Sequence, residues 1–152
     1  MDTFNSEQRS AIMRAIKSSD TRLEIAIRSA LWKGGLRYRK KSSLPGKPDM
    51  TFIGAKTVVF IDSCFWHGCP DHCRMPKSNA EYWTKKIRNN RERDLKINKK
   101  YQEIGWIVIR VWEHQLNEDF EKLIRKIDRI IRECYLKQNN SEFREKLKIP
   151  MP

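Results

Sequence analysis

The chain has 152 residues, enough for one domain with its own core, and its hydrophobic fraction of 39% excludes a disordered chain. Its 32 Lys and Arg against 19 Asp and Glu give a formal net charge of +13, which favours binding to polyanions such as nucleic acids. No segment approaches the ~20 apolar residues of a membrane span, and the first residues do not resemble a secretion signal. We therefore expect a cytoplasmic, nucleoid-associated protein without a membrane segment.

Two helices are expected first, at residues 6–17 and 21–33. The second begins with a capping box, in which Thr21 and Glu24 satisfy the free N–H groups of the first turn. Gly34-Gly35 can adopt positive φ and end it.

Strands are expected at residues 36–40, 50–53 and 57–61, the last two joined by a tight turn at Gly54-Ala55-Lys56. The apolar run from Val58 to Ile61 is typical of a central strand that is covered on both faces.

The second half of the chain predicts a long basic helix, a strand and a further helix, at residues 79–101, 106–112 and 117–136. Leu95 is expected on the thin apolar stripe of the first helix. The polar residues 137–152 predict a loose tail. This order indicates a single α/β domain over residues 1–136, with a mixed sheet flanked by helices.

Two carboxylates come next to the predicted hairpin. Asp49 precedes one strand and Asp62 ends the next, so pairing of the strands would bring them to the same edge of the sheet. Such oxygens bind Mg²⁺ together with waters and a substrate phosphate, and the metal can activate water. The alternative is that both are ordinary turn residues.

Three cysteines and two histidines crowd into the ten residues 64–73, and soft thiolate and imidazole donors suit tetrahedral Zn²⁺. The predicted ligands are Cys64, Cys69, His72 and the distant His114, with Cys73 as the alternative ligand. Buried reduced thiols are the competing interpretation. The fourth cysteine, Cys134, lies on an apolar helix face and is expected in the core.

Three features point to DNA contacts. Phe65 and Trp66 are adjacent and could enter a duplex between base steps, although one could instead be buried while the other lines a pocket. His67 follows them and suits proton transfer near neutral pH, or could be a zinc ligand or a surface residue. The basic helix is expected to contact phosphates, or to be simply solvated, through Lys85, Arg88, Arg91 and Arg93.

Several motifs follow each other at familiar distances: 44–49 (LPGKPD), 64–67 (CFWH), 81–83 (EYW), 91–94 (RERD), 105–106 (GW) and 111–113 (VWE). Together they resemble the very-short-patch repair (Vsr) endonucleases over roughly residues 6 to 135. The resemblance implies a restriction-endonuclease-like (PD-(D/E)XK-type) fold with a structural zinc loop. It also implies Mg²⁺-dependent nicking of duplex DNA 5′ to the T of a T:G mismatch, by a protein that is a monomer on DNA.

Carried over to this chain, the resemblance makes Asp49 the catalytic Mg²⁺ carboxylate, the backbone carbonyl of Ile61 the second metal ligand and His67 the general base. Glu24 and Asp94 resemble the supporting acidic residues. Phe65 and Trp66 resemble the intercalating wedge, together with Met13 from a DNA-contacting helix at residues 1–18.

Two positions depart from the family pattern. Asp62, which we include in the catalytic set, stands where a known member has His, and His114 stands where that member has a Cys zinc ligand. Two other functions compete with mismatch nicking: a zinc-stabilised DNA-binding protein without catalysis, and a restriction or junction-type nuclease of the same superfamily.

Overall fold

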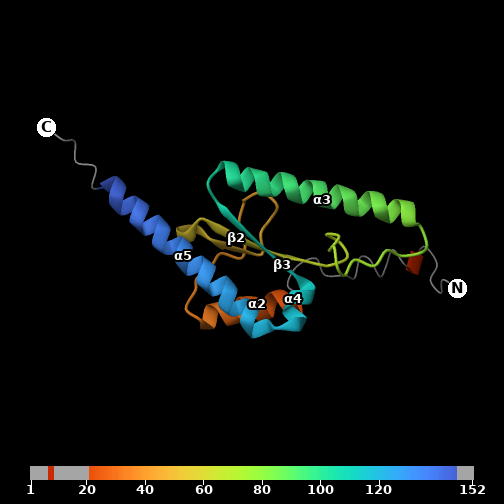
Figure 1. Cartoon of the computed structure of the whole chain (residues 1–152), viewed down its shortest axis with the longest axis horizontal. Helices are drawn as coiled ribbons and strands as arrows, with labels where there is room; N and C mark the ends of the chain where they lie inside the picture. The colour runs from red at the N-terminus through yellow and green to blue at the C-terminus, as the bar shows by residue number, and fades with distance from the viewer. Residues whose placement is uncertain (1–6, 9–20, 147–152) are drawn as a thin grey trace.

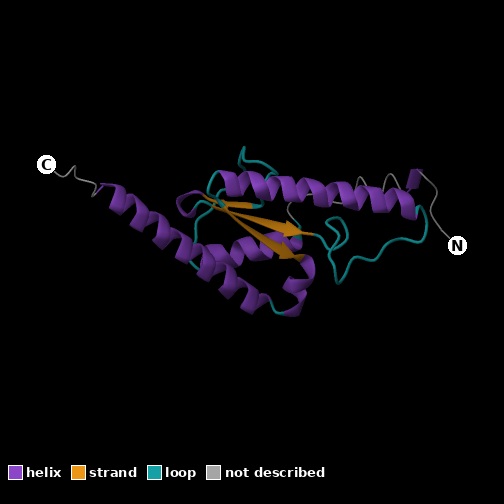
Figure 2. Cartoon of the chain, turned by 45° about the horizontal axis from the view of Figure 1, so that its top comes forward, coloured by secondary structure: helices purple, strands orange, loops and turns teal. Residues whose placement is uncertain are grey.

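The computed structural model describes residues 7–8 and 21–146. Its elements are α2 (Arg22–Lys33), β1 (Met50–Phe52), the 3₁₀ helix η1 (Ile53–Ala55), β2 (Thr57–Asp62), α3 (Ala80–Glu103), β3 (Ile107–Trp112), α4 (Glu113–Glu118) and α5 (Phe120–Lys146). Figure 1 shows α3 on one side of the sheet and α2, α4 and α5 on the other, and Figure 2 shows the same layers after a rotation. Within the described residues, no helix is long and apolar enough to cross a membrane. Met13 and almost all of the helix predicted at 6–17 lie outside the described residues.

The N-cap predicted at Thr21, at the start of α2, is confirmed. The backbone N–H of Glu24 donates to the Thr21 hydroxyl at 3.3 Å, and that hydroxyl donates to Glu24 Oε1 at 3.1 Å. Gly34 caps the other end through its N–H to the carbonyl of Ala30, and Gly35 follows at φ 91°.

The sheet is mixed, with β2 in the centre as the apolar run predicted. β1 pairs antiparallel with β2, with Met50 opposite Val59, and β3 pairs parallel with β2 on its other side. Successive residues of β2 point to opposite faces, so Val59 packs with α2 and α5 while Val58 and Phe60 pack with α3. Both faces are thus covered.

The larger of the two apolar clusters lies between the sheet and α2, α4 and α5. Its fully buried members include Ile27, Ile127 and Ile131, and Cys134 is 3% exposed, as predicted for a core thiol. The smaller cluster lies under α3, where the hydroxyl of Tyr101 donates to the carbonyl of Pro45 at 2.7 Å. This bond fastens the loop that leads to Asp49.

Several sequence predictions were wrong in detail. Residues 36–40 form only the single bridge Arg39–Thr51. Leu95 is 67% exposed, because Ile97, two residues later and on the opposite side of α3, is the residue that packs against the sheet. The last helix is preceded by the separate α4 and continues to Lys146, so the tail predicted over 137–152 is helical as far as 146. A helix anchored by packing can extend through polar residues when neither Pro nor Gly interrupts it.

Candidate active site and metal-binding cluster

Asp49 and Ile61 meet at one edge of the sheet because of the antiparallel register of β1 and β2. The backbone N–H of Asp49 donates to the carbonyl of Val59 at 3.0 Å, and the N–H of Ile61 donates to Asp49 Oδ2 at 2.7 Å. The hairpin therefore brings the first carboxylate beside the end of β2, as the sequence predicted.

A pocket of about 470 Å³ opens at this edge. It is lined by Glu24, Gly46, Lys47, Asp49, Phe60, Ile61, Asp62, His67, Arg93, Asp94, Ile97 and Arg110. All four side chains that the sequence singled out for catalysis line it, together with Ile61. They come from α2, the start of β1, the end of β2 and the following loop, so only the folded chain assembles them.

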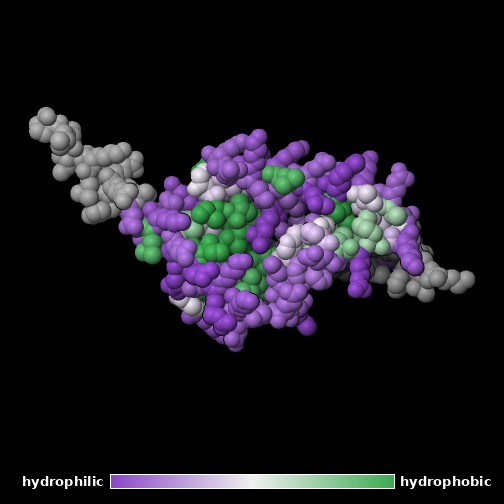
Figure 3. All heavy atoms as spheres, viewed as in Figure 1, coloured by the Kyte–Doolittle hydropathy of each residue, from purple (hydrophilic) through white to green (hydrophobic). Residues whose placement is uncertain are grey.

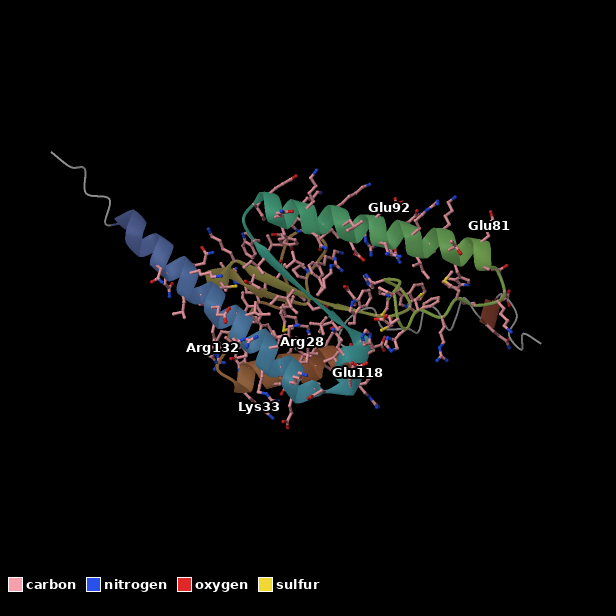
Figure 4. All side chains as sticks on the ribbon, in the orientation of Figure 1. Arg28, Lys33, Glu81, Glu92, Glu118 and Arg132 are labelled. Atoms are coloured by element: carbon pink, nitrogen blue, oxygen red, sulfur yellow. The ribbon has the colours of Figure 1, made fainter. Side chains whose placement is uncertain are left out.

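The electrostatics around Asp49 suit a cation. Burial raises the pKa of Asp49 to about 6, and the nearby carboxylates of Glu24 and Asp62 act in the same direction, against the hydrogen bond from Ile61 and the charge of Arg28. Glu24 is itself buried, in an ion pair of 3.2 Å with Arg28, which Figure 4 labels on α2. Hard carboxylate and backbone oxygens in an accessible pocket are the donor set that Mg²⁺ prefers. The residues present therefore fit that ion.

His67 is held by a carboxylate through one ring nitrogen. Its Nδ1 lies 2.7 Å from Asp94 Oδ2. An ionised carboxylate only accepts, so Nδ1 carries the hydrogen, and Nε2 is the acceptor of the neutral ring. The arrangement can take up a proton at Nε2.

Asp62 is not a free carboxylate. Nη1 of Arg110 donates to its Oδ1 at 2.9 Å and its Oδ2 at 2.7 Å, and its Oδ1 also lies 3.5 Å from His67 Nδ1. Arg110 was missed by the sequence analysis. A single Arg inside the otherwise apolar strand 107–112 was the available signal, because a buried guanidinium requires an acidic partner.

Three of the four predicted zinc ligands, Cys69, His72 and His114, lie within 4.8 Å of one another, and Cys64 contacts this group through His114. His114 Nδ1 is 3.2 Å from Cys64 Sγ and 3.6 Å from Cys69 Sγ, and His72 Nδ1 is 3.8 Å from Cys69 Sγ. A tetrahedral Zn²⁺ with ordinary bond lengths would separate such sulfur and nitrogen ligands by about 3.6 Å. Burial raises the pKa of the Cys64 thiol, and the adjacent Cys69 adds to this, as expected where a cation is needed to hold two thiolates. The donor set fits Zn²⁺.

Two residues beside the predicted zinc ligands lie differently from the prediction. Asp71 was missed, yet one of its oxygens groups with Cys69, His72 and His114, all within 4.8 Å of one another. The alternative ligand Cys73 points elsewhere, with its Sγ 3.7 Å from the carbonyl of Phe65.

The aromatic residues form a cluster. Phe65 and Trp66 have ring centroids 5.1 Å apart, and both pack edge-on against Trp83 of α3, at 5.2 and 5.7 Å. Neither of the two is fully buried. Both rings contact Trp83 because this segment is turned rather than extended: the N–H of Cys69 donates to the carbonyl of Cys64 at 2.9 Å.

The basic residues of α3 that the sequence singled out face solvent. Lys85, Arg88, Arg91 and Arg93 are all exposed on the helix, and Arg93 also lines the pocket. Figure 3 shows a mostly hydrophilic face, with an apolar area between α3 and α5. The exposed side chains are accessible to a phosphate backbone.

Several known proteins are similar in sequence to this chain. A family model described as DNA mismatch endonuclease Vsr matches residues 1–74. The Type II nicking enzyme V.NaeI of Lentzea aerocolonigenes is 48% identical over 117 residues, 73% of this chain and 70% of its own. The Type II nicking enzyme V.NmeDIP of Neisseria meningitidis serogroup C is 37% identical over 97% of this chain and all of its own length (100%). The DNA mismatch endonuclease Vsr of Escherichia coli K12 is 40% identical over 74% of this chain and 73% of its own.

The fold and the pocket define an α/β protein with a carboxylate and histidine site and a separate Cys/His cluster. With these relatives, the chain belongs to the Vsr family of DNA mismatch endonucleases, and it is a DNA nicking endonuclease.

Proposed function

We propose that the protein nicks duplex DNA 5′ to the T of a T:G mismatch, in very-short-patch repair, on a restriction-endonuclease-like fold. The observation that carries the proposal is the pocket in which Asp49, Ile61 and the pair formed by His67 and Asp94 come together. That is the set of groups which hydrolysis of a phosphodiester needs: a hard metal ligand and an oriented base.

Asp49 and the backbone carbonyl of Ile61 are the proposed ligands of Mg²⁺. Bound there, Mg²⁺ would stabilise the negative charge that develops on the scissile phosphate. Glu24, which lines the same pocket and is fastened by Arg28, would order water around this carboxylate. The N–H of Ile61 donates its hydrogen bond to Oδ2 of Asp49. Oδ1 of Asp49 is therefore the oxygen that would bind Mg²⁺.

His67 is the proposed general base. Its Nε2 would take the proton of the attacking water, and Asp94 would hold the ring in place and stabilise the imidazolium that results. Asp62 belongs to this site through its contacts with His67 and Arg110.

Zn²⁺ held by Cys64, Cys69, His72 and His114 would fasten the loop after β2 to α4, which carries His114. A loop held in this way loses less conformational entropy when it engages DNA. It would present Phe65 and Trp66 as a wedge at the mismatch, while Lys85, Arg88, Arg91 and Arg93 contact phosphates.

The decisive experiment is a nicking assay on duplexes that each carry one mismatch in an identical flanking sequence. Each strand carries its own label, and matched duplexes and a four-way junction serve as controls. We expect Mg²⁺-dependent cleavage of the T strand of the T:G duplex, at the bond 5′ to the T. Equal cutting of matched duplex or of the junction would favour the restriction or junction-type nuclease, and binding without any cleavage would contradict the proposal.

A further inference from the structure

Arg110 connects both carboxylates that face His67. Its Nη1 donates hydrogen bonds to both carboxylate oxygens of Asp62. Its Nη2 lies 3.3 Å from Asp94 Oδ1, and its Nε donates to Asn98 Oδ1 at 3.0 Å. Its guanidinium also lies 4.7 Å above the centre of the Phe60 ring. Each nitrogen of the guanidinium therefore lies beside a polar side chain: Nη1 beside Asp62, Nη2 beside Asp94 and Nε beside Asn98.

The nitrogen Nδ1 of His67 has two competing acceptors, Asp94 at 2.7 Å and Asp62 at 3.5 Å. One N–H forms one strong hydrogen bond at a time, so the ring could turn towards either carboxylate. Asp62 is only 3% exposed, and its charge is poorly screened by water. Without a cation beside it, this carboxylate would repel Asp94 and draw the N–H of His67 towards itself.

Arg110 removes this competition because it binds both oxygens of Asp62. Oδ2 of Asp94 is then left for His67, while Oδ1 of Asp94 faces Arg110. That second contact is an ion pair without hydrogen-bonding geometry: within the described residues, the buried Nη2 has no hydrogen-bond partner. It attracts Asp94 electrostatically and still leaves the carboxylate aligned on the imidazole.

Stability alone is a poor reason for this arrangement. Apolar side chains fill most of β3, and buried ion pairs are often no more stable than apolar residues of similar volume. The side chains of Arg110 and Asp62 are 17% and 4% exposed, and both residues line the pocket. The pair therefore lies where it can act on the site.

We propose that Arg110 is a positioning residue for nicking: by clamping Asp62 and attracting Asp94, it makes Asp94 the sole partner of His67 and keeps Nε2 of His67 as the acceptor in the pocket. The inference rests on the proposed function, in which Nε2 takes the proton from water. It assigns a task to a residue pair whose role the proposed mechanism leaves open.

The test compares Arg110→Gln and Arg110→Lys with wild type and with Arg132→Gln. Arg132 supplies a matched control, because it makes an ion pair of 2.7 Å with Asp128 on α5, away from α3, as Figure 4 shows. Single-turnover nicking and the Kd for the same mismatched duplex are measured at one pH and salt concentration. Imidazole ¹⁵N spectra report which ring nitrogen of His67 carries the hydrogen, and His67→Gln identifies its signals among the three histidines of the chain.

We expect both Arg110 variants to nick about tenfold to a hundredfold more slowly, with Kd within about threefold of wild type. The spectrum of Arg110→Gln should lose the single form with hydrogen on Nδ1. Arg132→Gln should match wild type in every measurement. The double variant Asp62→Asn with Arg110→Gln should nick at least about threefold faster than Arg110→Gln, because it removes the competing charge, a recovery that a purely structural role does not produce.

If Arg110→Gln does not fold, Arg110→Lys decides, since Lys keeps the charge but not the fork that binds two carboxylates. A wild-type nicking rate and spectrum in Arg110→Lys, or no recovery in the double variant, overturns the inference. Failure of wild type to nick any duplex overturns the proposed function instead, and the His67 spectra still decide whether Arg110 sets the ring.

Discussion

The N–H of Ile61 donates a 2.7 Å hydrogen bond to the carboxylate of Asp49, across the pairing of β1 with β2. This bond fixes the carboxylate against the backbone that we propose as the second metal ligand. Asn can accept the same hydrogen bond, so Asp49→Asn removes the charge with little change of shape.

We expect Asp49→Asn to lower the single-turnover nicking rate by at least about a thousandfold, because the metal loses its anionic ligand. The Kd for mismatched duplex should stay within a few-fold, since phosphate contacts come from Lys and Arg. Nicking and fluorescence anisotropy on one duplex measure both quantities. A variant that nicks at the wild-type rate contradicts the role of Asp49.

The same substitution should stabilise the metal-free protein at neutral pH. The pKa of Asp49 is about 6 in the folded state and near 3.8 in the unfolded chain, so the folded state binds the proton more tightly. Stability is therefore lost as the pH rises from about 4 to 6, by on the order of 2 kcal/mol for this half-buried group. The gain from Asp49→Asn should be full near pH 7 and shrink towards pH 4.

Urea unfolding without divalent cations, with both proteins compared at each pH, measures this gain. Glu103→Gln, at an exposed residue of α3, is the control and should show no comparable change. If Asp49→Asn does not stabilise the protein at pH 7, or stabilises it equally at pH 4, the pKa of Asp49 is not raised by burial.

The Cys/His cluster should hold about one equivalent of tightly bound zinc. Cys64→Ser and Cys69→Ser should lose the metal and much of the folded structure, whereas Cys73→Ser should keep both, because its thiol faces the carbonyl of Phe65. Elemental analysis and circular dichroism of protein purified without added metal check this. Well-folded, zinc-free wild type, or zinc loss in Cys73→Ser alone, would show that the ligand set is wrong.

The aromatic cluster should select the mismatch. Base–aromatic stacking contributes roughly 1–3 kcal/mol per base, so Trp66→Ala should weaken mismatch binding by about tenfold or more, and Phe65→Ala should act in the same direction. Nonspecific affinity depends on charge and should change less. Paired Kd values for mismatched and matched duplex at one salt concentration measure this. Equal losses on both duplexes, or none, would mean that the two rings only pack against Trp83.

Local chemistry in the sequence was enough to predict many elements. The N-cap at Thr21, the apolar run of β2 and the inward stripe of α5 depend on residues a few positions apart, whose preferences survive folding. The Cys/His crowding and the carboxylates beside the hairpin likewise placed the two candidate sites, because their spacing along the chain is short.

Only the tertiary structure decided which side chains, distant in the sequence, form ion pairs with each other. Arg110 and Asp62 are 48 positions apart, and their contact depends on the parallel pairing of β2 with β3 across the long helix α3. His67 meets Asp94 only where α3 crosses the loop after β2, and Phe65 and Trp66 pack on Trp83 only because that loop is turned rather than extended. Hydrophobic periodicity reports burial but not the partner of a buried charge, since a Coulomb interaction depends on distance in space and on the local loss of water.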